Sequence, residues 1–249
     1  MLAAALLCHS PAAVADQLTV AAASDLTYAL KDLSAVFQAK TGHTVKPSLG
    51  SSGSLFAQIS NGAPYDVFLS ADADFPSRLI SSGLADAPTK ITYARGVLVL
   101  WIPSKRSPLD ARLLLSPSIR KIAVANPQHA PYGRAAVAAL RKLGIYDQVA
   151  PKLVYGENVS QAAQFVDSGS AQAGLIAASL LFSSRKADGH WSPLPANSYP
   201  QFDQVGVVLK NAPHQQVARA FLQFLSTEEA RAIFARHGFI RRASELLSH

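Results

Sequence analysis

The sequence predicts an α/β protein of two lobes, with a mainly parallel sheet in each lobe and a hinge that the chain crosses twice. Short apolar segments alternate with amphipathic ones along most of the chain, as in parallel sheets joined by crossover helices. A second set of alternating segments begins after residue 94. An apolar segment at 204–209 is then followed only by helical patterns, so the chain is expected to return to the first lobe.

The first lobe is expected to contain residues 16–94 and 204–249. Its strands are short and apolar, and each of the first two is followed by a polar or glycine-rich turn and an amphipathic segment. The expected strands cover 17–23, 44–49, 66–69 and 204–209, and the expected helices follow Ser24 and cover 54–60, 214–225 and 227–237. Because ligands of open α/β sheets bind beyond the carboxyl ends of the strands, the turns after these strands are candidate sites.

The second lobe is expected to contain residues 95–203. It begins with an apolar segment that ends before Pro103, and it finishes near Pro200. The expected strands cover 96–102, 121–125, 153–155 and 173–177, and the expected helices cover 134–143 and 159–168. Two lobes joined by two crossings form a hinge with a cleft between them.

Composition limits the classes of partner. Of the 249 residues, 49% are hydrophobic, which is enough for a substantial core. The net charge of +7 comes from Lys and Arg residues that are scattered along the chain. A nucleic-acid partner would favour a concentrated basic patch, so we expect no nucleic-acid partner, and we expect a monomer.

The first fifteen residues have the character of a signal peptide. They contain no Lys, Arg, Asp or Glu, they are apolar from Leu2 to Leu7, and they end in Ala13-Val14-Ala15. This ending is typical of a signal-peptidase site and places the mature start near Asp16. A basic segment normally precedes the apolar run, so we expect the natural signal peptide to begin upstream of Met1. The prediction is an exported, periplasmic protein without disulfides, since the single cysteine, Cys8, leaves with the signal.

Four turns at strand-to-helix junctions could bind an anion without a charged side chain. They lie at 23–25, 50–53, 131–133 and 157–159, two in each expected lobe. A helix start presents unpaired backbone N–H groups and a partial positive charge. Ser24 and Ser52 would add hydroxyl donors, whereas Tyr132 and Val159 need contribute only their N–H groups. Each turn taken alone is equally compatible with simple helix capping.

The residues around these turns resemble the periplasmic molybdate-binding proteins of ABC transporters. The similar segments are AAASDL at 21–26, GSSGSL at 50–55, NGAPYDVFLSAD at 61–72, IAVANPQHAPYG at 122–133, ENVSQA at 157–162, AFLQFL at 220–225 and IFARHGF at 233–239. They occur in the family's order and spacing, and together they extend over roughly residues 18–239. The resemblance implies a type II periplasmic-binding fold, no cofactor, an oxyanion ligand and a transporter permease as partner.

The resemblance also implies a set of site residues. Ser24 and Ser52 would bind the dianion through hydroxyl and nearby backbone groups, and Tyr132 and Val159 through backbone N–H groups. The neighbouring amides of Asp25, Ser51 and Asn158 are further candidates. Many members place a tyrosine hydroxyl on the anion from the strand near 174–176, whereas this chain has Ala177. Whether Tyr132 or Ser179 supplies that hydroxyl instead stays open at this point.

The same residues favour molybdate or tungstate over phosphate. At neutral pH molybdate and tungstate carry no proton, so every oxygen accepts hydrogen bonds. Phosphate keeps at least one proton, and a site made only of donors leaves that proton unpaired, at a cost of about 1 to 3 kcal/mol. Sulfate is also free of protons but smaller, so its exclusion depends on cavity size.

Three other functions are compatible with part of the sequence but are less favoured. An enzyme is disfavoured because the chain lacks the Gly-x-Ser-x-Gly turn of serine hydrolases and the Gly-Lys-Ser/Thr of phosphate-binding loops, and its dispersed histidines show no metal-ligand spacing. A binding protein for sulfate, thiosulfate or another oxyanion is the principal alternative. The sensing half of a transcription regulator is disfavoured because no helix-turn-helix precedes the lobes.

Overall fold

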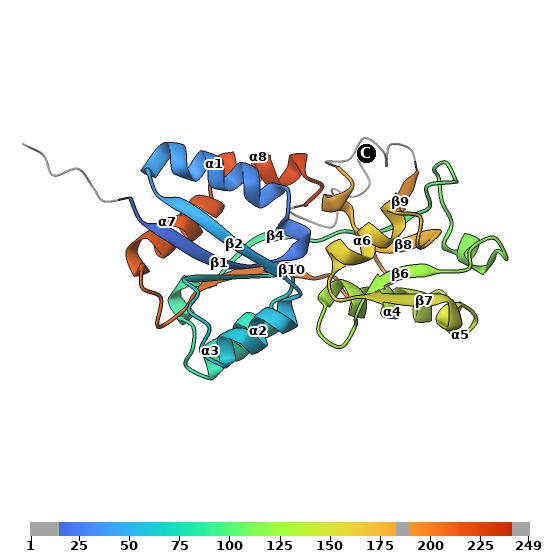
Figure 1. Cartoon of the computed structure of the whole chain (residues 1–249), viewed down its shortest axis with the longest axis horizontal. Helices are drawn as coiled ribbons and strands as arrows, with labels where there is room; N and C mark the ends of the chain where they lie inside the picture. Colours follow the sequence, from blue (N-terminus) through green and yellow to red (C-terminus); the bar gives the residue numbers. More distant parts are fainter. Residues whose placement is uncertain (1–14, 183–189, 241–249) are drawn as a thin grey trace, which may run out of the picture.

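A computed structural model describes residues 15–182 and 190–240. The predicted signal peptide, residues 1–15, thus lies outside the described residues except for its last position. Two five-stranded sheets lie side by side, each with its own helices (Figure 1). The expected two-lobed α/β fold is confirmed. None of the helices in the described part of the chain has both the length and the apolar character of a membrane span.

The first sheet has the strand order β2-β1-β3-β10-β4. Its strands are β1 (Gln17–Ala23), β2 (Thr44–Gly50), β3 (Val67–Ser70), β4 (Ile91–Arg95) and β10 (Asp203–Val208). Strand β1 is buried on both faces of the sheet, as its apolar sequence predicts. Leu18 and Val20 belong to the core under one set of helices, and Ala21 belongs to the core on the opposite face.

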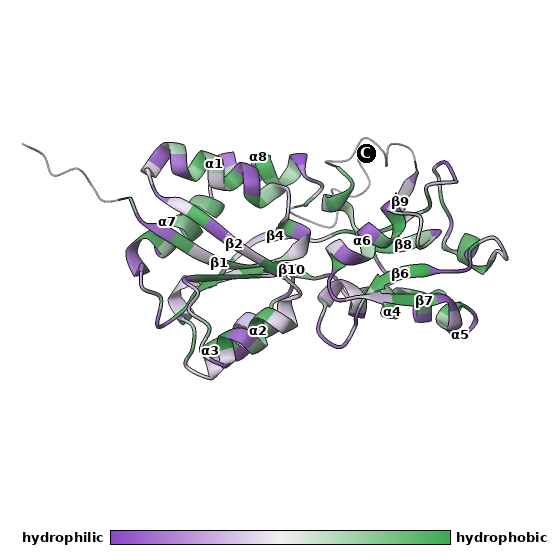
Figure 2. Cartoon of the chain, viewed as in Figure 1, coloured by the Kyte–Doolittle hydropathy of each residue, from purple (hydrophilic) through white to green (hydrophobic). Residues whose placement is uncertain are grey.

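The second sheet has the strand order β7-β6-β8-β5-β9. Its strands are β5 (Leu98–Trp101), β6 (Ile122–Ala125), β7 (Leu153–Gly156), β8 (Ala173–Ala177) and β9 (Trp191–Pro193). A single apolar core lies around this sheet. Figure 2 shows that the inner strands of both sheets are mostly hydrophobic, whereas hydrophilic residues lie mainly on the outer helix faces, the loops and the edge strands β2 and β9.

Strand direction follows from the double crossing. In each sheet four of the five strands run the same way, and the exception, β10 in one and β5 in the other, is antiparallel to both neighbours. Each exception is the first strand after the chain has crossed from the other lobe. The chain enters at the edge where the other strands end, so it must run in the opposite direction.

Helices cover both faces of the first sheet. Helices α1 (Ala29–Thr41), α7 (Gln215–Leu225) and α8 (Glu228–Arg236) lie on one face, and α2 (Ser52–Ser60) and α3 (Asp74–Ser81) lie on the other (Figure 1). Phe37 of α1 packs edge-on against Phe221 of α7, with ring centroids 5.1 Å apart. The two final helices therefore dock on the first lobe, as the sequence predicts.

The second sheet is covered by α4 (Pro131–Lys142), α5 (Tyr146–Val149) and α6 (Val159–Asp167). Helix α4 begins three residues before the predicted start, because Pro131 occupies its first turn, where the missing N–H is not needed. Helix α2 likewise begins at Ser52, so residues predicted as a tight turn form the first helical turn. Ser24 is the first residue of a short 3-10 helix, Ser24–Leu26, and α1 starts only at Ala29.

The two crossings lie at residues 96–97 and 194–202, between β4 and β5 and between β9 and β10. The Gly96 N–H donates to the Phe202 carbonyl at 3.3 Å, which joins the crossings. A Cβ at position 96 would stand 2.2 Å from the Phe202 ring, so only glycine fits there. Arg95 pairs with Asp203 in the first sheet, so β4 ends at residue 95 and β10 begins at residue 203. The lobe boundaries that we propose from the sequence, 94/95 and 203/204, each differ from these strand ends by one residue.

Candidate functional site

The carboxyl ends of the two sheets face each other around a small cavity of about 10 Å³. Its lining comes from both lobes and consists of Ala23, Ser24, Asp25, Gly50, Ser51, Ser52, Ala71, Ala130, Pro131, Tyr132 and Val159. All four principal candidates of the sequence analysis, and two of the secondary ones, thus share one cavity. A space of this size is about that of one water molecule, so it excludes drug-sized ligands and leaves the lining groups of the two lobes close together.

Three helix starts present backbone donors here. Ser52 and Val159 are the first residues of α2 and α6, and Tyr132 is the second residue of α4. The first N–H groups of a helix have no partner within the helix. Pro131 has no N–H group, so the Tyr132 N–H is the first donor of its helix. The positive ends of three helix dipoles therefore meet at the cavity.

The two serine hydroxyls are oriented by neighbouring backbone groups. Ser52 Oγ accepts a hydrogen bond from the Ala71 N–H at 2.9 Å, and Ser24 Oγ accepts one from the Ser160 N–H at 3.3 Å. Since each oxygen is already an acceptor, its own proton stays available for donation to another species. The Ser160 contact also joins the lobes, because Ser24 follows β1 and Ser160 lies in α6.

The secondary candidates divide into two groups. Ser51 lines the cavity, but its side chain caps α2 by accepting from the Ser54 N–H at 3.2 Å. Asn158 caps α6 in the same way, accepting from the Gln161 N–H at 3.0 Å, and it does not line the cavity. Ala177, at the end of β8, is also outside the lining and is fully buried in the second core.

Neither proposed substitute for the family tyrosine directs a free hydroxyl proton at the cavity. Ser179 donates its proton to the Asp25 carbonyl at 2.7 Å. The Tyr132 ring packs edge-on against Phe202, with centroids 4.7 Å apart, and its hydroxyl interacts with the Asp25 carboxyl group. Tyr132 therefore places its N–H at the cavity and its side chain against the hinge.

Asp25 is a carboxyl group buried beside the cavity. Its Oδ2 accepts from Gln204 Nε2 at 2.6 Å, and within residues 15–182 and 190–240 its Oδ1 has no hydrogen-bond partner. The Tyr93 hydroxyl in turn donates to Gln204 Oε1 at 3.1 Å. Burial raises the pKa of Asp25 from 3.8 to about 6, although the interactions with Tyr132 and Gln204 oppose that rise.

The closed cleft is held by contacts that the sequence analysis did not identify. The Gly53 N–H donates to the His129 carbonyl at 2.8 Å, and a Cβ at position 53 would stand 2.6 Å from that oxygen. Arg134 forms an ion pair with Asp72. The Ser54 hydroxyl donates to Glu157 Oε1 at 2.9 Å. No local pattern reveals these pairs, because each joins residues of different lobes.

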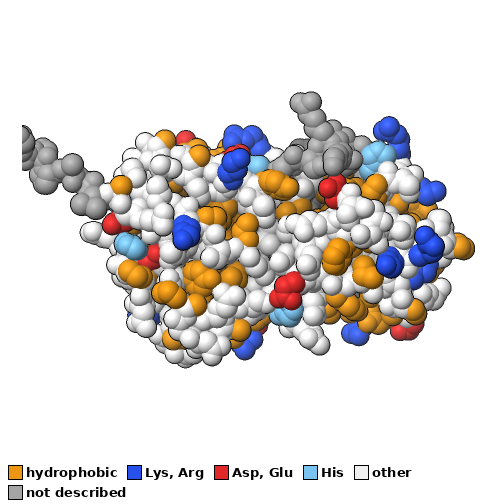
Figure 3. Space-filling view, viewed as in Figure 1, with side chains coloured by type: hydrophobic (Ala, Val, Ile, Leu, Met, Phe, Trp, Pro, Cys, Tyr) orange, Lys and Arg blue, Asp and Glu red, His pale blue; other side chains and the backbone are white. Residues whose placement is uncertain are grey.

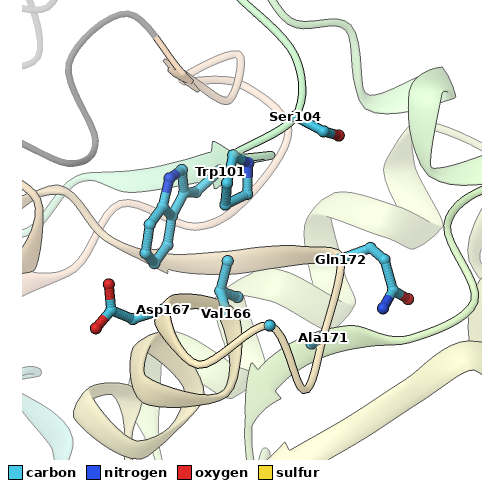
Figure 4. A pocket seen from close by; sticks show the side chains of 8 residues that line it. Trp101, Ser104, Val166, Asp167, Ala171 and Gln172 are labelled. Atoms are coloured by element: carbon cyan, nitrogen blue, oxygen red, sulfur yellow. The ribbon is translucent and has the colours of Figure 1, made fainter.

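Other features of the surface fit an anion site less well. A pocket of about 320 Å³ lies in the second lobe beside Trp101, Val166 and Ala171 (Figure 4). Its lining comes from one lobe only, and no set of helix starts converges on it. On the face shown in Figure 3, Lys and Arg side chains are scattered over both lobes, so that face presents no concentrated basic patch.

Comparisons with known proteins agree with this architecture. The family of bacterial extracellular solute-binding proteins matches residues 18–240. The molybdate-binding protein ModA of Rhodobacter capsulatus is 38% identical over 92% of this chain and 90% of its own length. The Azotobacter vinelandii ModA is 36% identical over 92% of this chain and 91% of its own length.

Solved structures show the same relationship. The periplasmic molybdate-binding protein of Azotobacter vinelandii superposes with a TM-score of 0.86 at 36% identity, covering 90% of this chain and 99% of that one. The sulfate-binding protein SubI of Mycobacterium tuberculosis has a TM-score of 0.77 at 16% identity, covering 94% of this chain and 89% of that one, and shares the fold alone. The two-lobed architecture is thus periplasmic-binding-protein-like, and the chain belongs to the family of bacterial extracellular solute-binding proteins.

Proposed function

We propose that this protein captures molybdate or tungstate between its lobes and delivers the anion to the permease of an ABC importer. The observation that supports this most strongly is the convergence of uncharged donors from both lobes on one small cavity. The relatives with over 30% identity include several named molybdate-binding proteins. In this proposal the ligand contacts are the hydroxyls of Ser24 and Ser52 and the N–H groups of Tyr132 and Val159.

Capture and closure are one event in this mechanism. Ser24 and Ser52 belong to the first lobe, and Tyr132 and Val159 belong to the second. The full set of donors exists only when the lobes meet, so the anion binds the closed form more tightly and shifts the population towards it. We further propose that the protein is exported to the periplasm, as the name of the Azotobacter vinelandii structure states for that protein, and that it acts as a monomer with a permease. Co-purification with that permease tests the partner, and sedimentation tests the oligomeric state.

A thermal-shift panel tests the ligand. We expect molybdate and tungstate each to raise the melting temperature of the purified protein, because a ligand that binds only the folded state stabilises it by mass action. Phosphate is expected to have a much smaller effect, since the four proposed ligand contacts are all donors and leave its proton without an acceptor among them.

The same panel includes sulfate and thiosulfate as comparison anions. Stabilisation by sulfate equal to that by molybdate would favour the alternative, a binding protein for a smaller oxyanion. A panel in which no anion changes the melting temperature would contradict the proposed function altogether.

A further inference from the structure

The Asp25 carboxyl group faces neutral partners only. Tyr132 of α4 and Gln204 of β10 interact with the carboxyl group, Tyr93 of β4 lies beyond Gln204, and Ser179 binds the backbone carbonyl. Backbone N–H groups of Asp25 and Leu26 also interact with the carboxyl group, and among the described residues it forms no ion pair with Lys, Arg or His. If ionised, it would be a buried negative charge without a compensating cation.

The charged groups nearest to the cleft are paired elsewhere. Arg134 forms an ion pair with Asp72 across the lobes. His129 lies with Nε2 3.7 Å from Glu157 Oε2 and with Nδ1 2.9 Å from Ser51 Oγ. These groups hold the lobes together, but they do not neutralise Asp25.

A dianion in the cavity would add to the electrostatic cost. Asp25 is one of the residues that line the cavity and its carboxyl group is buried, so a negative charge on it would act on the oxyanion through a water-poor space. A like charge favours the neutral form of a carboxyl group. Protonation at Oδ1 removes the repulsion and supplies a donor on the oxygen that has no partner among the residues described.

We propose that Asp25 is neutral when the oxyanion is bound, so that the protein takes up one proton from solution with each dianion that it captures. The proton adds to Asp25 Oδ1, and no other bond forms or breaks. This inference rests on the proposed function, because it requires a dianion in the cavity. In this proposal Asp25 is a positioning residue, because its protonation links the charge of the bound anion to the closure of the two lobes.

The direction of the pH effect follows from the closed structure. Burial raises the pKa of Asp25 to about 6 against the opposing effect of its hydrogen bonds, and a bound dianion raises it further. In an open cleft the carboxyl is hydrated and its pKa lies nearer the ordinary value. Between these two pKa values the bound form holds an extra proton, so affinity falls as pH rises, by at most about tenfold per pH unit.

Isothermal titration calorimetry measures the proton directly. Molybdate is titrated into the purified protein near pH 6.5 in several buffers that differ in protonation enthalpy, and the slope of binding enthalpy against buffer enthalpy gives the protons taken up. We expect roughly 0.5 to 1 proton per anion for the wild type and none for Asp25→Asn, which has no titratable group there. The wild-type Kd is expected to rise with pH from about pH 4 to above pH 6, the interval between the two pKa values of Asp25.

Asp72→Asn and His129→Gln serve as comparison variants, since both residues carry ionisable side chains at the lobe interface. Both variants are expected to keep the proton uptake per bound anion, even where the loss of an interlobe contact weakens binding. Uptake that disappears in either comparison variant and persists in Asp25→Asn would overturn the assignment, as would a wild-type slope of zero. The slope of binding enthalpy against buffer enthalpy, measured for the wild type, tests proton uptake even if Asp25→Asn does not fold. Absence of any molybdate binding would instead contradict the proposed function itself, and this inference with it.

Discussion

Replacing Gly53 with alanine is expected to weaken oxyanion binding by roughly 2 to 4 kcal/mol, or about 30- to 1000-fold. The added Cβ would stand 2.6 Å from the His129 carbonyl oxygen and 2.8 Å from the His129 Cα. Backbone atoms cannot move aside as a flexible side chain can, so the lobes must stay apart. The interlobe hydrogen bond from the Gly53 N–H is then lost as well.

The effect should be confined to closure. Gly53 contacts His129 across the cleft, and its φ angle is not in the positive range, so alanine is tolerated within α2 itself. Titration calorimetry measures the affinity, and the melting temperature without ligand checks the fold. Ser54→Ala is the matched control, because it removes an exposed interlobe hydrogen bond to Glu157 without adding bulk. Wild-type affinity in Gly53→Ala would show that binding does not require this closed arrangement.

Replacing Ser52 with alanine is expected to weaken binding by about 1.5 to 3 kcal/mol, the range for a hydrogen bond to a charged group. This corresponds to a loss of about 10- to 150-fold. The hydroxyl oxygen is occupied by the Ala71 N–H, so its proton is the group that can donate to the anion. The backbone N–H of residue 52 remains in the variant, and binding is therefore reduced rather than abolished.

The Ser52 substitution also removes the acceptor of a buried N–H group, so some loss of stability accompanies the loss of affinity. Equilibrium dialysis with molybdate, at a temperature where the ligand-free variant is fully folded, separates the two effects. Ser60→Ala, at the exposed far end of the same helix, is the control and should bind as the wild type does. Unchanged affinity in Ser52→Ala would remove this hydroxyl from the proposed site.

Much of the fold follows from short-range patterns. Residues that are close in sequence predict the apolar strands, the amphipathic helices and the return of the chain to the first lobe at β10. The prediction was weakest at helix starts and in the segment before the first crossing. Helices α2 and α4 begin with Ser, Gly or Pro, which also form turns, and neither α3 nor β4 was predicted as a separate element.

By itself, the sequence determined the alternation of elements, the two crossings and the four turns with donors for an anion, since each depends on local residue order. Only the tertiary structure decided which groups meet across the cleft. Asp72 and Arg134 are 62 positions apart, and Ser24 and Ser160 are 136 positions apart. Their pairing depends on how two separately folded lobes are oriented. The same orientation of the lobes buries Asp25 beside the cavity, and no pattern along the chain predicts this burial.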